Sequence, residues 1–263
     1  MVNARLNMKH FYLLLLLISS QAFSQQTSDW LNSLENPKDP FFHELKPDNF
    51  LTQYLSYDLS ELLKPRTEFL GYIGSDYRKI EVAFTSIRRN DNIPNQYYVT
   101  GKTIVFKNSC DFEGTITFEQ FREFKNMNYG LDSMYANSGF KAQGIAIGKY
   151  LFSENAKQSH VGIFEGIITA WWYVDKNGKI QYDNLSPYSD DYKNNQYIGT
   201  WSEYGKNSVR TCNWGERRIP FSGDLDIGAG EFSVNPKYLN KGWEDLKKPA
   251  IGETEGAVRI NEN

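Results

Sequence analysis

Four five-residue segments of the chain repeat one pattern, in which an aromatic residue, a glycine and a large residue alternate with variable positions. The segments are FLGYI at 69–73, FEGTI at 112–116, FEGII at 164–168 and YIGTW at 197–201. On a β-strand the first, third and fifth residues share a face, so each segment places a glycine gap between two large side chains. Such a gap lets a strand bend sharply or accept a bulky neighbour. The repeat therefore predicts equivalent strands of one curled sheet.

The rest of the central region also alternates with period two. Further strands are expected at 79–87, 96–107 and 144–152, and Asn177-Gly178 matches a tight hairpin turn that needs a positive φ. Another hairpin is expected from 197–204 and 208–214. About nine or ten strands without intervening helices predict an all-β antiparallel meander, closed as a barrel or folded as a two-sheet sandwich. The meander resembles lipocalins in architecture alone, and no family is assigned because no convincing G-x-W motif opens it.

The N-terminal region is typical of a secretory signal peptide over residues 1–24. Arg5 and Lys9 precede an apolar run at 11–18, and Ala22 and Ser24 suit the small-residue positions of a cleavage site after Ser24. The run is too short to span a bilayer, and no cysteine beside it could take a lipid. We expect an exported protein of the periplasm or cell exterior, without a lipid anchor or transmembrane segment.

The expected mature chain divides into three parts. Residues 25–47 form a polar, proline-containing lead-in, residues 48–248 form a single β-domain, and residues 249–263 form a polar tail. The β-domain is expected to begin with one helix over 48–64, which has Asp48 as its N-cap and Pro65 as its stop.

Charge and histidine content argue against several classes of protein. The formal net charge is −3, and it becomes −5 when the signal peptide and its two basic residues are removed, which disfavours nucleic-acid binding. Only His43 and His160 remain in the mature chain, and neither lies near a nucleophile motif or a second zinc ligand at short spacing. A histidine-dependent hydrolase and a zinc site are both disfavoured.

Carboxylates are the remaining candidates for catalysis. Glu113 and Glu165 occupy the same position in two copies of the repeat, so they would face each other if their strands were neighbours, as the acid and base of a glycosidase must. The alternative is that both are solvated on an exposed sheet face.

Residues 223–232, GDLDIGAGEF, form a second acidic candidate with Asp224, Asp226 and Glu231. The order of ligands does not fit an EF-hand, although calcium or a sugar remains an alternative occupant. Alternation instead predicts a short strand with Leu225 and Ile227 buried and the two aspartates outside. The preceding sequence NWGERRIP offers Trp214, Glu216, Arg217 and Arg218 as partners for these acids in a network at a rim.

Aromatic residues and one polar loop provide the candidates for ligand binding. Trp171 and Trp172 are adjacent and must lie on opposite faces of their strand, so one can fill the core while the other is exposed. An exposed indole is a platform for a sugar ring or a small apolar ligand. The full set of candidates is Trp171, Trp172, Trp201, Trp214, Asp190, Asp191 and Tyr192.

Cys110 and Cys212 are the only cysteines, and export would permit a disulfide between them. No metal or other cofactor is expected, apart from the calcium alternative above.

Three functions stay open at this point. The expected one is an exported, non-catalytic binding protein with carbohydrate as its ligand. The alternatives are a glycan-active hydrolase or lyase that uses paired carboxylates, and a structural or inhibitory module that binds another protein. The sequence does not indicate an oligomeric state.

Overall fold

A computed structural model describes residues 25–38, 43–187, 189 and 192–246. The predicted signal peptide and C-terminal tail lie outside these residues.

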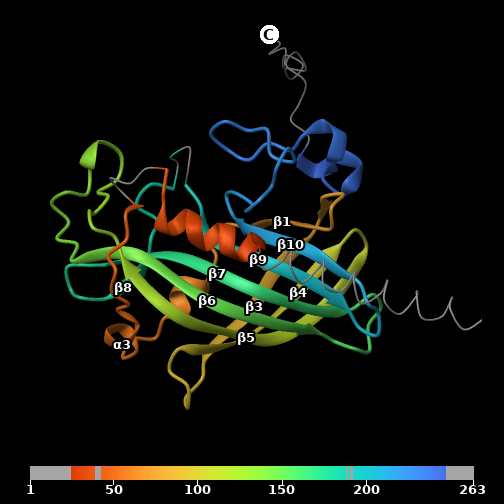
Figure 1. Cartoon of the computed structure of the whole chain (residues 1–263), viewed down its shortest axis with the longest axis horizontal. Coiled ribbons are helices and arrows are strands. Elements are labelled where there is room, and N and C mark those ends of the chain that lie inside the picture. The colour runs from red at the N-terminus through yellow and green to blue at the C-terminus, as the bar shows by residue number, and fades with distance from the viewer. Residues whose placement is uncertain (1–24, 39–42, 188, 190–191, 247–263) are drawn as a thin grey trace, which may run out of the picture.

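The described chain forms one antiparallel sheet that curls into a half-barrel (Figure 1). Its strands follow the order β2-β1-β10-β9-β7-β6-β5-β4-β3, and β8 adds to the end of β7. Their bounds are β1 Phe69–Ile73, β2 Arg78–Lys79, β3 Glu81–Arg89, β4 Gln96–Val105, β5 Asn108–Glu123, β6 Ala142–Glu154, β7 Gly162–Val174, β8 Ile180–Tyr182, β9 Asn194–Glu203 and β10 Val209–Glu216. The all-β antiparallel prediction is confirmed, with the barrel-like form in place of two stacked sheets.

All four glycine segments lie in this sheet, in β1, β5, β7 and β9, but only those of β7 and β9 are neighbours. There Gly166 stands opposite Gly199 in the register, and Tyr150 of β6 stands opposite Gly166. The Tyr150 side chain lies over both glycines, because a Cβ at either position would approach its hydroxyl oxygen within 2.8 Å. The glycine gaps therefore make room for a buried aromatic side chain, as expected for a strongly curled sheet.

The inner face of the half-barrel holds the main core, which is largely aromatic. Tyr197 and Trp214 stack with ring centroids 4.8 Å apart, and Tyr150 packs edge-on against both. Side chains fill this interior in the way usual for small barrels, so the centre of the half-barrel is a packed core.

The single helix expected over 48–64 is instead two one-turn helices, α3 (Leu51–Tyr54) and α4 (Ser60–Leu63). Between them, the Asp58 carboxylate accepts a hydrogen bond from the Ser60 amide, and the Leu59 amide donates to the Tyr97 hydroxyl at 2.8 Å. This local turn and the tertiary hydrogen bond to Tyr97 take the place of the hydrogen bonds of a continuous helix. As a result, Leu59, Leu62 and Leu63 point into one end of the half-barrel, and the two helices close that end.

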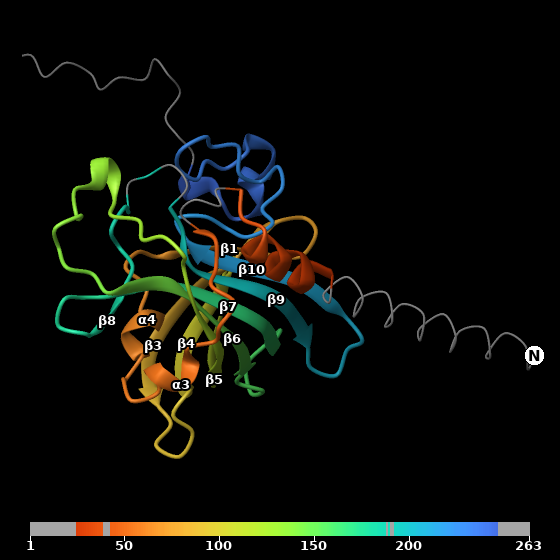
Figure 2. The ribbon, with the colours of Figure 1, turned by 60° about the vertical axis from the view of Figure 1, so that its left-hand side comes forward.

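Two segments cover parts of the outer face of the sheet (Figure 2). A helix over residues 25–35, within the polar lead-in, packs Leu31 and Leu34 against a cluster that includes Ile145 and Ile147 of β6. The C-terminal segment places Leu225 and Trp243 against Tyr72 of β1. Both termini of the described chain are therefore held against the outside of one sheet.

The predicted hairpin at Asn177-Gly178 joins β7 to β8. Gly178 has φ +82°, and the Asp175 carboxylate accepts hydrogen bonds from the amides of Asn177 and Lys179. The expected hairpin of 197–204 and 208–214 is also present, as β9–β10, and β6 pairs with β7 in the same antiparallel way.

Candidate functional site

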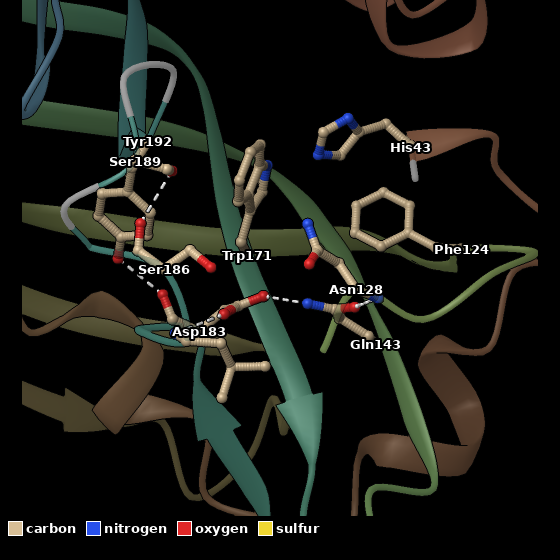
Figure 3. A pocket seen from close by; sticks show the side chains of 10 residues that line it. His43, Phe124, Asn128, Gln143, Trp171, Asp183, Ser186, Ser189 and Tyr192 are labelled. Carbon is tan, nitrogen blue, oxygen red and sulfur yellow. Dashed lines mark hydrogen bonds between the residues drawn. The ribbon is translucent and has the colours of Figure 1, made fainter. Parts of the chain in front are cut away.

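Two neighbouring hollows lie on the outer face and share one aromatic wall. The wall consists of His43, Phe124 and Trp171. On one side is a small hollow of about 80 Å³, drawn in Figure 3, and on the other a larger hollow of about 480 Å³ beneath the helix at 25–35. A partly exposed aromatic wall with space on both sides is the strongest candidate for ligand binding in the described chain.

Strand alternation explains why Trp171 belongs to this wall. Trp172 points into the core and is fully buried, whereas Trp171 points to the outer face and is half-buried. His43 lies beside the indole with ring centroids 5.2 Å apart, and Phe124 meets it edge-on at 6.5 Å. The prediction that one tryptophan of the pair fills the core and the other lies outside is confirmed.

The polar side of the small hollow is a hydrogen-bonded chain that begins at a buried carboxyl group. The Gln143 side-chain amide donates to Asp183 Oδ2 at 2.6 Å, and Gln143 Oε1 accepts from the Asn128 amide at 2.7 Å. Asp183 Oδ1 accepts from the Leu185 amide at 3.1 Å. Asp183 is 3% exposed and burial raises its pKa above the ordinary value for an aspartate.

Tyr192 forms the far wall of the small hollow, and its ring lies edge-on to Trp171 at 6.4 Å. Its hydroxyl donates to the Asp183 carbonyl oxygen at 2.7 Å, which ties the loop after β8 to the start of β9. Burial raises the Tyr192 pKa to about 12. The structure thus brings together two of the predicted ligand-binding residues, Trp171 and Tyr192, while Asp190 and Asp191 lie outside the described residues.

The other predicted tryptophans do not belong to this site. Trp172 and Trp214 are part of the packed interior, and Trp201 is buried near the open end of the half-barrel. None of the three offers the exposed ring face that a sugar platform on the outer surface requires.

Glu113 and Glu165 do not form a catalytic pair. Both are exposed, but β6 lies between their strands, so Glu113 stands opposite Ser153 and Glu165 opposite Leu151. Equivalent positions in a repeat become neighbours only when their strands are adjacent in the sheet, and β5 and β7 are not.

The acidic segment at 223–232 forms a loop that is held closed from within. Arg218 pairs with Asp226 at 2.6 Å and also donates to the carbonyl oxygens of Gly228, Ala229 and Gly230. The Asp226 carboxylate accepts further hydrogen bonds from the amides of Gly228 and Ser233. Of the predicted network, the Arg218–Asp226 pair is present, whereas Trp214 lies in the main core and Glu216 bonds to Tyr182 and Asn195. The contacts of Arg218 indicate structural closure of this segment.

The expected alternation in this segment is only partly correct. Leu225 is buried, but Ile227 is 57% exposed and the Asp226 side chain is turned inward. The Asp226 side chain points inward because its carboxylate forms an ion pair there with Arg218. Asp224 is exposed and pairs with Lys237 and the Tyr238 hydroxyl, while Glu231 lies beside Arg217 and Arg218 in a separate surface hollow.

The predicted disulfide between Cys110 and Cys212 is wrong. Both thiols are free and buried. Cys110 lies in β5 and Cys212 in β10, and three strands stand between them in the sheet. Disulfide geometry requires Cα atoms less than about 7 Å apart, which strands so placed do not provide.

Sequence reasoning missed the polar half of the site. Asp183 had one available signal, since it directly follows a short strand, where loop carboxylates often serve function. No sequence signal pointed to Gln143, because the residues around it in the sequence have the pattern of an ordinary strand. His43 was noted only as one of two scarce histidines. Among the described residues, no three His, Cys, Asp or Glu side chains gather as a metal site would require.

Comparisons with known proteins add nothing to this site, since no family model, curated protein or solved structure matches the chain. No helix in the described part of the chain is both long and apolar enough to cross a membrane.

Proposed function

We propose that this chain is an exported, non-catalytic binding protein whose ligand is a carbohydrate held at the Trp171 wall. The observation that carries the proposal is the half-buried Trp171 ring with the Asp183–Gln143 pair beside it. Sugar rings combine an apolar face with a rim of hydroxyl groups, and this site combines an aromatic face with acceptors and donors for such hydroxyls.

The aromatic wall supports stacking at low entropic cost. Trp171 is held between His43 and Tyr192, so its ring loses little freedom when a ligand covers it. The two hollows on either side of the wall give a sugar chain room to extend past a single ring.

The polar side supports recognition of hydroxyl groups. Asp183 Oδ1 and Oδ2 each accept one hydrogen bond from the described residues, which leaves acceptor capacity on both oxygens. A buried acceptor strongly rejects a ligand that leaves it unpaired, so Asp183 would discriminate between sugars that differ in one hydroxyl.

Binding without cleavage is favoured because Asp183 is the single carboxyl group among the described residues of the small hollow. The larger hollow also has one among its described residues, that of Asp29 on the covering helix. Glycoside hydrolysis generally uses two carboxyl groups about 5 to 9 Å apart. The two glutamates that the sequence suggested for this role lie on separate, non-adjacent strands.

The proposal is tested with purified protein on a panel of polysaccharides and oligosaccharides. Retention in affinity gels and calorimetric titration report binding, and an assay of reducing ends reports cleavage. We expect at least one saccharide to bind without release of reducing ends. Release of reducing ends would establish the hydrolase instead, and failure to bind any saccharide would favour the protein-binding alternative.

Substitutions of Trp171 test whether the saccharide binds at the aromatic wall. Trp171→Ala is expected to weaken binding about tenfold or more, while Trp171→Phe keeps a smaller ring and loses less. Tyr98→Ala is the matched control, because it removes another partly exposed aromatic ring, on β4, away from both hollows. Equal binding by Trp171→Ala and Tyr98→Ala would contradict the assignment.

A further inference from the structure

The two ends of the half-barrel differ, and the open end holds a cavity that the carbohydrate site does not use. Helices α3 and α4 close one end, while the hairpins β4–β5, β6–β7 and β9–β10 turn at the other (Figure 1). Within this open end is a cavity of about 410 Å³. Its apolar walls are Ile73, Val105, Phe106, Phe164 and Trp201.

Most charges around the cavity are neutralised within the protein. Arg78 pairs with Asp76 at 2.9 Å, and Lys206 pairs with Glu203 at 2.5 Å. Glu154 and Arg210 also line the cavity, but among the described residues neither forms an ion pair within 4.0 Å. The Glu203 carboxylate attracts Arg210 from farther away.

Glu154 is a buried carboxylate, 5% exposed, held at the base of the open end by neutral donors. Its Oε2 accepts from Trp201 Nε1 and from the Gly162 amide, each at 2.9 Å, and its Oε1 accepts from the Thr103 hydroxyl at 2.5 Å. Oε1 thus retains acceptor capacity. Burying a negative charge without a cation is costly, and a ligand cation would offset that cost.

Arg210 stands opposite Trp201 in the β9–β10 register, and its guanidinium lies over the indole ring, 5.6 Å from the centroid. Trp201 therefore contacts both charged groups. Its indole N–H donates to Glu154, and the Arg210 guanidinium lies over the face of its ring. The cavity presents a negative group at its base and a positive group at its rim, joined by one aromatic residue.

We propose that this cavity binds a small zwitterion with an apolar side chain, of the class of a free amino acid or short peptide. The ligand ammonium pairs with Glu154 Oε1, its carboxylate pairs with the Arg210 guanidinium, and its side chain lies against Phe164 and Ile73. Arginine suits this role because its planar donors match a carboxylate. The proposal does not depend on carbohydrate binding at the outer face.

Three probes with the same phenyl ring measure how much each charged group of the ligand contributes to binding. Calorimetric titration of the full-length mature protein compares L-phenylalanine, phenethylamine, which lacks the carboxylate, and 3-phenylpropanoate, which lacks the ammonium. We expect L-phenylalanine to bind at least tenfold more tightly than either single-charge probe. N-acetyl-L-phenylalanine lacks the ammonium group and so tests the Glu154 contact by a change in the ligand. This avoids a substitution at a buried carboxylate, which could unfold the protein. We expect this probe to bind as weakly as 3-phenylpropanoate.

Arg210→Gln is expected to remove the preference for L-phenylalanine over phenethylamine, and Arg210→Lys is expected to restore part of it. Arg88→Gln is the matched control, because Arg88 also lies over an aromatic ring, that of Tyr98, at the other end of the sheet. Saccharide retention by Arg210→Gln should equal that of the wild type. Equal affinity for all probes, no binding of any probe, or tightest binding of a single-charge probe would overturn the proposal.

Discussion

Gly166 and Gly199 stand directly opposite each other in adjacent strands, and the Tyr150 side chain occupies the space that their missing side chains leave. A Cβ at Gly199 would lie 2.2 Å from the Tyr150 hydroxyl oxygen, and one at Gly166 would lie 2.8 Å from it. This pair of glycines makes room for a large aromatic side chain on the inner face. It connects the most prominent sequence repeat to the packing of the half-barrel.

Gly199→Ala is expected to destabilise the fold by about 1 to 3 kcal/mol, the usual cost of overpacking a core, as measured by urea unfolding. The same substitution in a Tyr150→Phe background should cost less, because the closest side-chain contact is gone. Tyr150→Phe alone should be close to neutral, since its buried hydroxyl has no hydrogen-bond partner among the described residues. An equal cost of Gly199→Ala in both backgrounds would instead assign the strain to the backbone carbonyl of Glu165, also 2.2 Å away.

Arg218→Ala is expected to destabilise the protein by about 3 kcal/mol and to raise amide hydrogen exchange across 226–233. The substitution leaves Asp226, a mostly buried carboxylate, without its cation, and removes three bonds to loop carbonyls. Lys237→Ala is the control, because it breaks the ion pair with Asp224 on the exposed side of the same segment. A loss of stability for Lys237→Ala as large as that for Arg218→Ala would contradict a buried Arg218 anchor.

Both cysteines are expected to resist a thiol reagent in the folded protein at pH 8 and to react fully after denaturation. Burial raises the pKa of each thiol, and the nearby Glu154 carboxylate raises it further, so little reactive thiolate forms. A reducing agent should leave the thermal unfolding midpoint unchanged, because no disulfide is present to break. A lower midpoint under reducing conditions would show that the two thiols are bonded.

The contribution of Asp183 to the free energy of unfolding is expected to fall as pH rises above about 4, the ordinary pKa of an aspartate. Burial raises the Asp183 pKa in the folded protein, so the folded state binds its proton more tightly than the unfolded chain does. That contribution to stability is complete at low pH and is lost as pH rises through the folded-state pKa. Asp183→Asn removes this titration, so the free energy of unfolding of the wild type, measured relative to that of the variant, should fall between pH 4 and 7.

Local patterns in the amino-acid sequence predict much of the sheet. Alternation places Trp171 and Trp172 on opposite faces because successive side chains of a strand must point to opposite sides. Asn177-Gly178 marks a hairpin because glycine adopts a positive φ without strain. Consecutive strands that are joined by a short turn pair as expected, as β4 does with β5 and β9 with β10, because the turn leaves them few other partners.

The sequence by itself thus determined the strands, their two faces and the local hairpins, since each depends on residues only a few positions apart. Tertiary structure alone decided that β7 pairs with β9 and β1 with β10, because long-range pairing depends on how all the large inner side chains pack together. That choice separates Glu113 from Glu165 and Cys110 from Cys212, and brings Asp183 and Gln143 beside Trp171. Residues distant in the chain become a site only once the curvature of the sheet and the order of its strands are set.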